Sequence, residues 1–117
     1  MNEISRRSLL LDYYGGLLTD KQREIYDFYY QQDLSLGEIA ELQGVSRNAV
    51  YDLLNRTNEK LEHYDAILGL IAADLKADQA KENLLKRLQH WQGTVTDHLS
   101  EAEQSKLAVL LADLKQL

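Results

Sequence analysis

Residues 36–55, LGEIAELQGVSRNAVYDLLN, decide the fold that the sequence predicts. Two apolar patterns with helical spacing are separated by Gly44, and glycine takes the left-handed conformation of a tight turn at little cost. Ala40 is small where the two helices would cross, Leu42 is expected to face inward, and Ser46 is placed to cap the second helix. The shared core would come from Ile39, Val45, Val50 and either Leu53 or Leu54. This arrangement is typical of a helix-turn-helix.

Capping boxes predict where other helices begin. In this pattern a Ser or Thr is followed three positions later by Glu or Gln, and the two side chains satisfy backbone N–H groups at the helix start. The matching pairs are Thr19 with Gln22, Ser35 with Glu38, and Ser100 with Glu103. The Gly15–Gly16 pair predicts the end of the first helix, because glycine readily leaves the helical conformation.

A long helix is predicted after Ser46. Its inward positions recur at alternating spacings of four and three: Val50, Leu54, Thr57, Leu61, Tyr64, Leu68, Ile71 and Leu75. A bend is expected at Gly69, because glycine costs a helix about 1 kcal/mol relative to alanine. Two further amphipathic stripes follow, one of Ala80, Leu84, Leu88 and Trp91 ending near Gly93, and one of Leu107, Leu110, Leu111, Leu114 and Leu117. We therefore expect an all-α protein, with a helix-turn-helix domain at residues 1–75 and a C-terminal helical extension at residues 76–117.

Composition narrows the class of protein. The 117 residues include no proline, which favours helices, and no cysteine, which excludes disulfides and thiolate metal sites. The N-terminus lacks a signal-peptide pattern, and no apolar run approaches the roughly 18 residues of a membrane-spanning helix. We expect a cytoplasmic protein with no membrane insertion.

The exposed face of the second helix in the pair is the candidate binding site. It would present Ser46, Arg47, Asn48, Tyr51, Asn55 and Arg56. Arg and Asn can bond base edges in pairs, and Tyr can bond a phosphate or stack on a base, so this face predicts contact with DNA or RNA. Asp52 and the net charge of −6 oppose phosphate binding, so any such binding should be weak and sensitive to salt. The alternative is that the same face meets a protein and no nucleic acid.

Catalytic and metal-binding patterns are missing from the sequence. His63, His90 and His98 lack the i, i+4 spacing of a helical zinc site, and Gly15–Gly16 is not followed by the residues of a phosphate-binding loop. No serine stands in the context of a nucleophile elbow. We expect no enzyme activity, no cofactor and no metal.

Several segments between Leu10 and Leu75 resemble, in order, the YlxM family of small bacterial proteins, which is typical of Gram-positive species. They are LLTDKQ (17–22), YY (29–30), DLSL (33–36), EIAE (38–41), VSRNAVYD (45–52) and Arg56. That family is similar to region 4 of bacterial sigma factors, the helix-turn-helix that reads promoter DNA. The resemblance implies a regulatory protein connected with the signal recognition particle pathway, whose components would be partners. The family commonly has Gln in place of Asn48 and a basic residue in place of Asn55, so this chain is expected to make fewer phosphate contacts.

The apolar stripes extend beyond the helix-turn-helix. Its core cannot cover the positions from Leu61 to Leu75 or those of the last helix, which must pack on each other, on the N-terminal helices or on another copy. A symmetric dimer is the commonest oligomer, and it would carry two reading heads. We predict a homodimer formed through the long and C-terminal helices.

Overall fold

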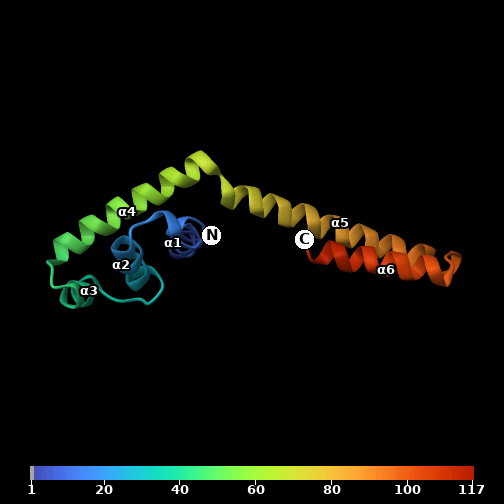
Figure 1. The fold of residues 1–117 in the computed structure, drawn as a ribbon, viewed down its shortest axis with the longest axis horizontal. Helices are drawn as coiled ribbons and strands as arrows, with labels where there is room; N and C mark the ends of the chain where they lie inside the picture. Colours follow the sequence, from blue (N-terminus) through green and yellow to red (C-terminus); the bar gives the residue numbers. More distant parts are fainter. Residues whose placement is uncertain (1) are drawn as a thin grey trace. The chain divides into compact units, whose positions relative to one another are not determined.

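The computed structural model describes residues 2–117, and within them the secondary structure is entirely helical (Figure 1). The elements are α1 (Glu3–Tyr14), the 3₁₀ turn η1 (Gly15–Leu17), α2 (Asp20–Tyr30), α3 (Leu36–Gln43), α4 (Arg47–Leu68), α5 (Leu70–Val95), the 3₁₀ turn η2 (Thr96–His98) and α6 (Glu101–Lys115). The chain divides into two compact units, an N-terminal unit ending at Ile71 and a C-terminal unit comprising Ala72–Leu117. The all-α prediction is confirmed.

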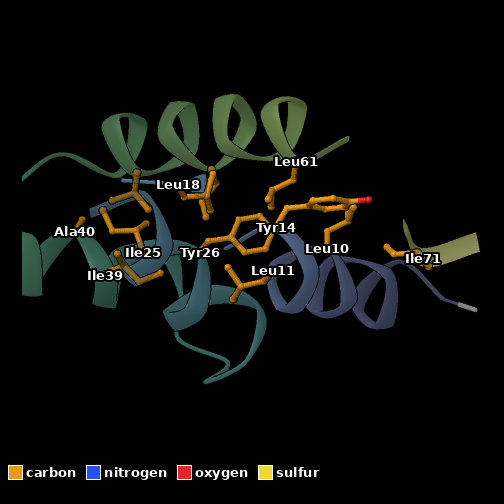
Figure 2. Packing of buried hydrophobic residues seen from close by; sticks show 12 residues of the cluster. Leu10, Leu11, Tyr14, Leu18, Ile25, Tyr26, Ile39, Ala40, Leu61 and Ile71 are labelled. Carbon is orange, nitrogen blue, oxygen red and sulfur yellow. The ribbon is translucent and has the colours of Figure 1, made fainter. Parts of the chain in front are cut away.

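The core of the N-terminal unit forms where α4 contacts α1, α2 and α3 (Figure 2). On α4, Val50, Leu54, Thr57 and Leu61 recur at spacings of four, three and four residues and are all buried, as the helical period predicts. They meet buried side chains of the other helices and of the segment between η1 and α2, namely Leu10, Leu11, Tyr14, Leu18, Ile25, Tyr26, Ile39 and Ala40. The first half of the predicted apolar stripe is therefore the core of this unit.

The predicted helix starts are confirmed by the capping hydrogen bonds. At all three capping boxes, the Ser or Thr side chain accepts from the backbone N–H three residues later, and the Gln or Glu side chain accepts from the N-cap backbone N–H. The first helix ends at Tyr14, but Gly15 has a φ of −56° and continues into a 3₁₀ turn. Its end therefore does not depend on a left-handed glycine. α5 passes through Gly93 and ends at Val95, one residue beyond the Gly93–Thr94 pair at which the sequence predicted its end.

Two apolar residues predicted to face inward are exposed. Leu42 is 64% exposed, and Val45 in the turn is also exposed. The inward stripe of α3 consists of Leu36, Ile39, Ala40 and Gln43. Leu42 lies about 110° around the helix from the middle of that stripe, at 100° per residue. The prediction considered that Leu42 is apolar but not its angular position around the helix.

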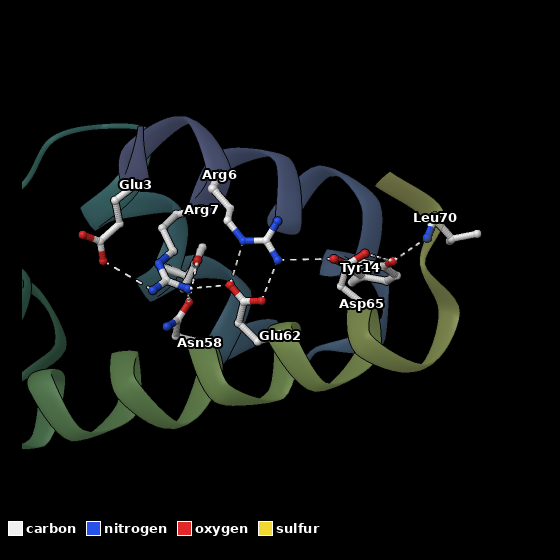
Figure 3. Close-up of polar contacts among 9 residues, drawn as sticks. Glu3, Arg6, Arg7, Tyr14, Asn58, Glu62, Asp65 and Leu70 are labelled. Atoms are coloured by element: carbon white, nitrogen blue, oxygen red, sulfur yellow. Dashed lines mark hydrogen bonds and ion pairs between the residues drawn. The ribbon is translucent and has the colours of Figure 1, made fainter. Parts of the chain in front are cut away.

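Hydrogen bonds surround a helix break at Gly69, the position at which the sequence predicted a bend. Gly69 has a φ of +60°, and its N–H donates to the carbonyl oxygen of Asp65 over 2.7 Å. The hydroxyl of Tyr14 in α1 donates to Asp65 Oδ1 over 2.6 Å and accepts from the Leu70 N–H over 3.1 Å. One buried tyrosine thus ties α1 to both sides of the break (Figure 3).

Two arginines of α1 attach it to α4 through carboxylates (Figure 3). Arg6 makes a two-pronged contact with Glu62, with Nε to Oε1 at 3.0 Å and Nη2 to Oε2 at 2.6 Å, and also reaches Asp65 at 3.3 Å. Arg7 pairs with Glu62 at 3.2 Å and donates to Asn58. The hydrogen bond from Arg6 holds the pKa of Glu62 below its ordinary value.

This pairing predicts a pH-dependent contribution to stability. A depressed carboxyl pKa stabilises the fold at pH values above the unfolded pKa, about 4.3, and the stabilisation is lost as pH falls below it. We expect Glu62→Gln to lower the free energy of unfolding by about 1 kcal/mol at pH 7, because the pair is partly exposed and screened by solvent. The difference from the wild type should shrink towards zero near pH 3, measured by urea denaturation at both pH values.

The matched control is Glu59→Gln, an exposed glutamate of the same helix. It should change the unfolding free energy by less than about 0.5 kcal/mol at either pH. Equal losses in the two variants at pH 7 would show that the Arg6–Glu62 pair contributes nothing specific.

Candidate nucleic-acid interface

The reversal between α3 and α4 has the geometry of a helix-turn-helix. Gly44 ends α3 with a φ of +66°, and the Val45 N–H donates to the Ala40 carbonyl oxygen over 3.1 Å. Ser46 then opens α4, its Oγ accepting from the Ala49 N–H over 3.1 Å. These bonds satisfy backbone groups at the end of one helix and the start of the next.

Gly44 is required by backbone conformation alone. A Cβ placed on it would meet no atom within 4 Å, so a larger residue would fit in space but not in dihedral angle. We expect Gly44→Ala to cost about 1 kcal/mol of unfolding free energy, the penalty of a left-handed residue with a side chain. The matched control is Gly16→Ala, because a Cβ on Gly16 would also meet no atom within 4 Å and Gly16 has no positive φ. Its unfolding free energy, measured by urea denaturation, should stay within about 0.5 kcal/mol of the wild type.

The predicted site residues lie together on the first three turns of α4. Ser46, Arg47, Asn48, Tyr51, Asn55 and Arg56 are all exposed. Tyr51 is 54% exposed although its neighbour Val50 is buried, because adjacent positions of a helix point about 100° apart. Val50 and Leu54 hold this face from beneath against α3 and the other helices. The surface is thus a polar face on a rigid support.

Local contacts orient the two cations of the face. The Nε of Arg47 lies 3.9 Å from the position that a Cβ on Gly37 would occupy, so the guanidinium lies beside the start of α3. Arg56 turns back along its own helix, its Nε donating to the Asp52 carbonyl oxygen at 3.5 Å, the limit of a hydrogen bond. Within the described residues neither arginine makes an ion pair, so both charges are available to an external anion.

The first turn of α4 also differs from those of the preceding helices. It carries no acidic residue, whereas α1, α2 and α3 each have one in their first turn. The N-terminus of a helix carries partial positive charge from its free N–H groups, and an acidic side chain there neutralises it. At α4 that partial charge remains open to a phosphate.

The surroundings of the face are acidic. Up to Ile71 the sequence has seven Lys and Arg against twelve Asp and Glu, and Arg6, Arg7 and Arg23 are already paired with carboxylates. Glu38 and Glu41 of α3 and Asp52 of α4 are exposed. Attraction to phosphate therefore depends on the few unpaired cations of the face.

The sequence prediction missed the exposed position of Leu42. This side chain borders a shallow hollow together with Glu38 and Glu41. The angle of Leu42 on α3 could have indicated its exposure.

Other kinds of site find no support in the part of the chain that the structure describes. No three His, Asp or Glu side chains among residues 2–117 are arranged to hold a metal ion. His63, His90 and His98 are each exposed. No helix in this range has both the length and the apolar character to span a bilayer.

Comparison with known proteins identifies the family. A sequence model of the UPF0122 family, described as "Putative helix-turn-helix protein, YlxM / p13 like", matches residues 1–105. This confirms the resemblance seen in residues 10–75, and the description is of a helix-turn-helix protein rather than of an enzyme.

Individual relatives agree with the family match. A UPF0122 protein of Caldanaerobacter subterraneus is 56% identical over 64 residues, a match that spans 55% of each chain. A UPF0122 protein of Clostridium kluyveri is 47% identical over 85 residues, covering 73% of this chain and 77% of the relative. One of Desulforamulus reducens is 44% identical over 86 residues, covering 74% and 71%. With a reversal at Gly44 that has the predicted geometry, the chain belongs to the UPF0122 family of YlxM/p13-like helix-turn-helix proteins.

Proposed function

We propose that the protein is a regulatory helix-turn-helix protein that binds DNA or RNA in the cytoplasm. The contacts would come from Ser46, Arg47, Asn48, Tyr51, Asn55 and Arg56. The observation that carries the proposal is that these polar residues form one exposed face at the start of α4, above a buried apolar stripe. A helix supported in this way can enter a major groove without disturbing its own core.

Different residues of this face would make different kinds of contact with the nucleic acid. Arg47 and Asn48, in the first turn, would reach base edges, since helix-turn-helix proteins contact bases through the start of the second helix. Tyr51 and Arg56 would contact the phosphate backbone, joined by the open N–H groups of the first turn. A homodimer would present two such faces to two half-sites.

Salt dependence tests the proposal. Each neutralised phosphate of a duplex lowers the slope of log K against log salt by about 0.9, so two or three contacts predict a slope near −2 to −3. Binding to DNA and to structured RNA would be measured by fluorescence anisotropy between 50 and 300 mM salt. A flat response, or no binding to either at 50 mM, would refute it.

A second candidate function is favoured by the acidic surroundings. The exposed Glu38, Glu41 and Asp52, with the exposed Leu42 beside them, suit a basic and partly apolar protein surface better than a phosphate backbone. The family resemblance suggests the signal recognition particle and its GTPase as the machinery involved. The test is a pull-down with that GTPase before and after nuclease treatment. Capture that survives nuclease, with no nucleic-acid binding at low salt, would favour this function over the first.

A further inference from the structure

The C-terminal unit has almost no core of its own. Its helix α6 runs back along α5 (Figure 1), and Lys81 Nζ donates to the carbonyl oxygen of Leu117 over 2.8 Å. Among residues 72–117, all of which the structure describes, Leu111 is the one buried side chain. Amphipathic helices are stable when their apolar stripes are covered by another layer. Two helices that bury one side chain between them leave this requirement unmet.

Six large apolar side chains among residues 72–117 are exposed, and all but Leu75 and Val109 gather on one face of this helical pair. The half-buried positions, among them Lys81 and Leu88 on α5 and Leu107 and Leu114 on α6, mark the stripe by which each helix faces the other. Each of these is followed, three residues later, by a large and substantially exposed apolar side chain. Those side chains are Leu84 (46% exposed), Trp91 (49%), Leu110 (63%) and Leu117 (84%).

Helical geometry places three of these residues, Leu84, Trp91 and Leu110, on the same side. A step of three residues rotates the side chain by about −60° from the contact stripe. In an antiparallel pair of right-handed helices, equal rotations from the two contact stripes point to the same face of the pair. Leu84 and Trp91 from α5 therefore lie beside Leu110 from α6. Leu117 is two residues past the end of α6, where the hydrogen bond from Lys81 holds it next to α5. We call this surface the hairpin face.

The hairpin face offers much of the apolar area that a dimer needs. If a fully exposed leucine presents about 120 Å² and a tryptophan about 250 Å², the four residues leave on the order of 350 Å² of apolar surface open. A standard interface buries about 800 Å² per partner, of which about 65% is apolar in homodimers. The four residues would therefore supply more than half of that apolar area, and patches of this size are often functional.

Charge favours a second copy over a strongly charged partner. Residues 72–117 contain six Lys and Arg against seven Asp and Glu, a net charge of −1. Two of these units can approach each other with little repulsion. The residues up to Ile71 carry a net charge of −5, which would oppose self-association through that part of the chain.

We propose that two copies of the chain associate through their hairpin faces to form a four-helix bundle from α5, α6 and their counterparts. Bundles of this kind bury apolar stripes from antiparallel helix pairs. Leu84, Trp91, Leu110 and Leu117 would form the bundle core, and the interface is isologous because both copies present the same face. The association does not depend on nucleic acid, so it stands or falls separately from the proposed binding function.

The test is the mass of the full-length chain in solution without nucleic acid. Sedimentation equilibrium from 1 to 100 µM should give twice the chain mass of 13.5 kDa for the wild type. Leu84→Glu with Leu110→Glu should weaken association at least about 100-fold, because two carboxylates would be buried at each face. The matched control is Leu75→Glu with Ala108→Glu, exposed positions on the opposite side of the same helices, which should remain dimeric.

Trp91 provides an independent readout, since it is the only tryptophan of the chain. Its emission should shift to longer wavelength as the wild type is diluted through its dissociation range, and the control should behave in the same way. A wild type that keeps the mass of one chain at 100 µM overturns the proposal. A control pair as monomeric as the hairpin-face pair would also overturn it, because any association would then not use this face.

Discussion

Replacing Arg47 and Arg56 together with alanine is expected to reduce nucleic-acid affinity at 50 mM salt about 100-fold and to leave the fold intact. Loss of an arginine contact to a base edge costs about 1–3 kcal/mol, and loss of a phosphate contact weakens binding to all sequences alike. Both side chains are exposed and make no ion pair within the described residues, so their removal should change the unfolding free energy by less than about 0.5 kcal/mol.

The control separates local contact from total charge. Lys21→Ala with Lys76→Ala removes the same two positive charges from exposed positions outside the α4 face. Its affinity should stay within about threefold of the wild type, since neither lysine belongs to the proposed contact set and attraction between exposed charges is screened by salt. The salt slope should fall by about 1 for each phosphate contact that is lost. Equal losses of affinity in the two double variants would assign binding to overall charge and exclude the α4 face as the specific site.

Local signals predicted the helix-turn-helix because its geometry is local. A helix cap joins residues three positions apart, and a left-handed turn requires a single residue of the right type. The roles of Ser35, Gly44 and Ser46 could therefore be predicted directly from the sequence. The exposed face of α4 followed from the same pattern, since a buried stripe at Val50 and Leu54 leaves the intervening positions facing outward. What those positions bind does not follow from helical period, because exposure alone specifies no ligand.

Contacts distant in sequence could not be predicted in this way. Tyr14 and Asp65 are 51 positions apart, and Arg6 and Glu62 are 56 apart. Their residue types occur widely on helix surfaces, so only the packing of α1 on α4 identifies them as partners. The sequence also did not show how much of the apolar stripe of α4 is buried. A repeat of apolar residues does not reveal where the helices that pack on it end.

The pair Leu61 and Leu68 tests that last distinction. Both belong to one apolar stripe of α4 seven residues apart, so the pattern alone treats them as equivalent. In the structure Leu61 is fully buried and Leu68 is 52% exposed. We expect Leu61→Ala to lower the unfolding free energy by about 2–5 kcal/mol through lost burial and a cavity, and Leu68→Ala by less than about 1 kcal/mol. Urea denaturation of both variants at one protein concentration measures the difference.

The stability loss expected for Leu61→Ala is large compared with the total stability of the N-terminal unit. A unit of about 70 residues has a total stability of roughly 4–10 kcal/mol, so a loss of about 5 kcal/mol would unfold much of a unit whose stability is at the lower end of that range at 25 °C. Helicity at 222 nm should then fall for Leu61→Ala and not for Leu68→Ala. If the two variants instead lose equal stability, Leu68 must be covered in solution. Should its cost also grow with protein concentration, the covering surface belongs to a second copy, and the dimer contact would include α4 rather than the hairpin face alone.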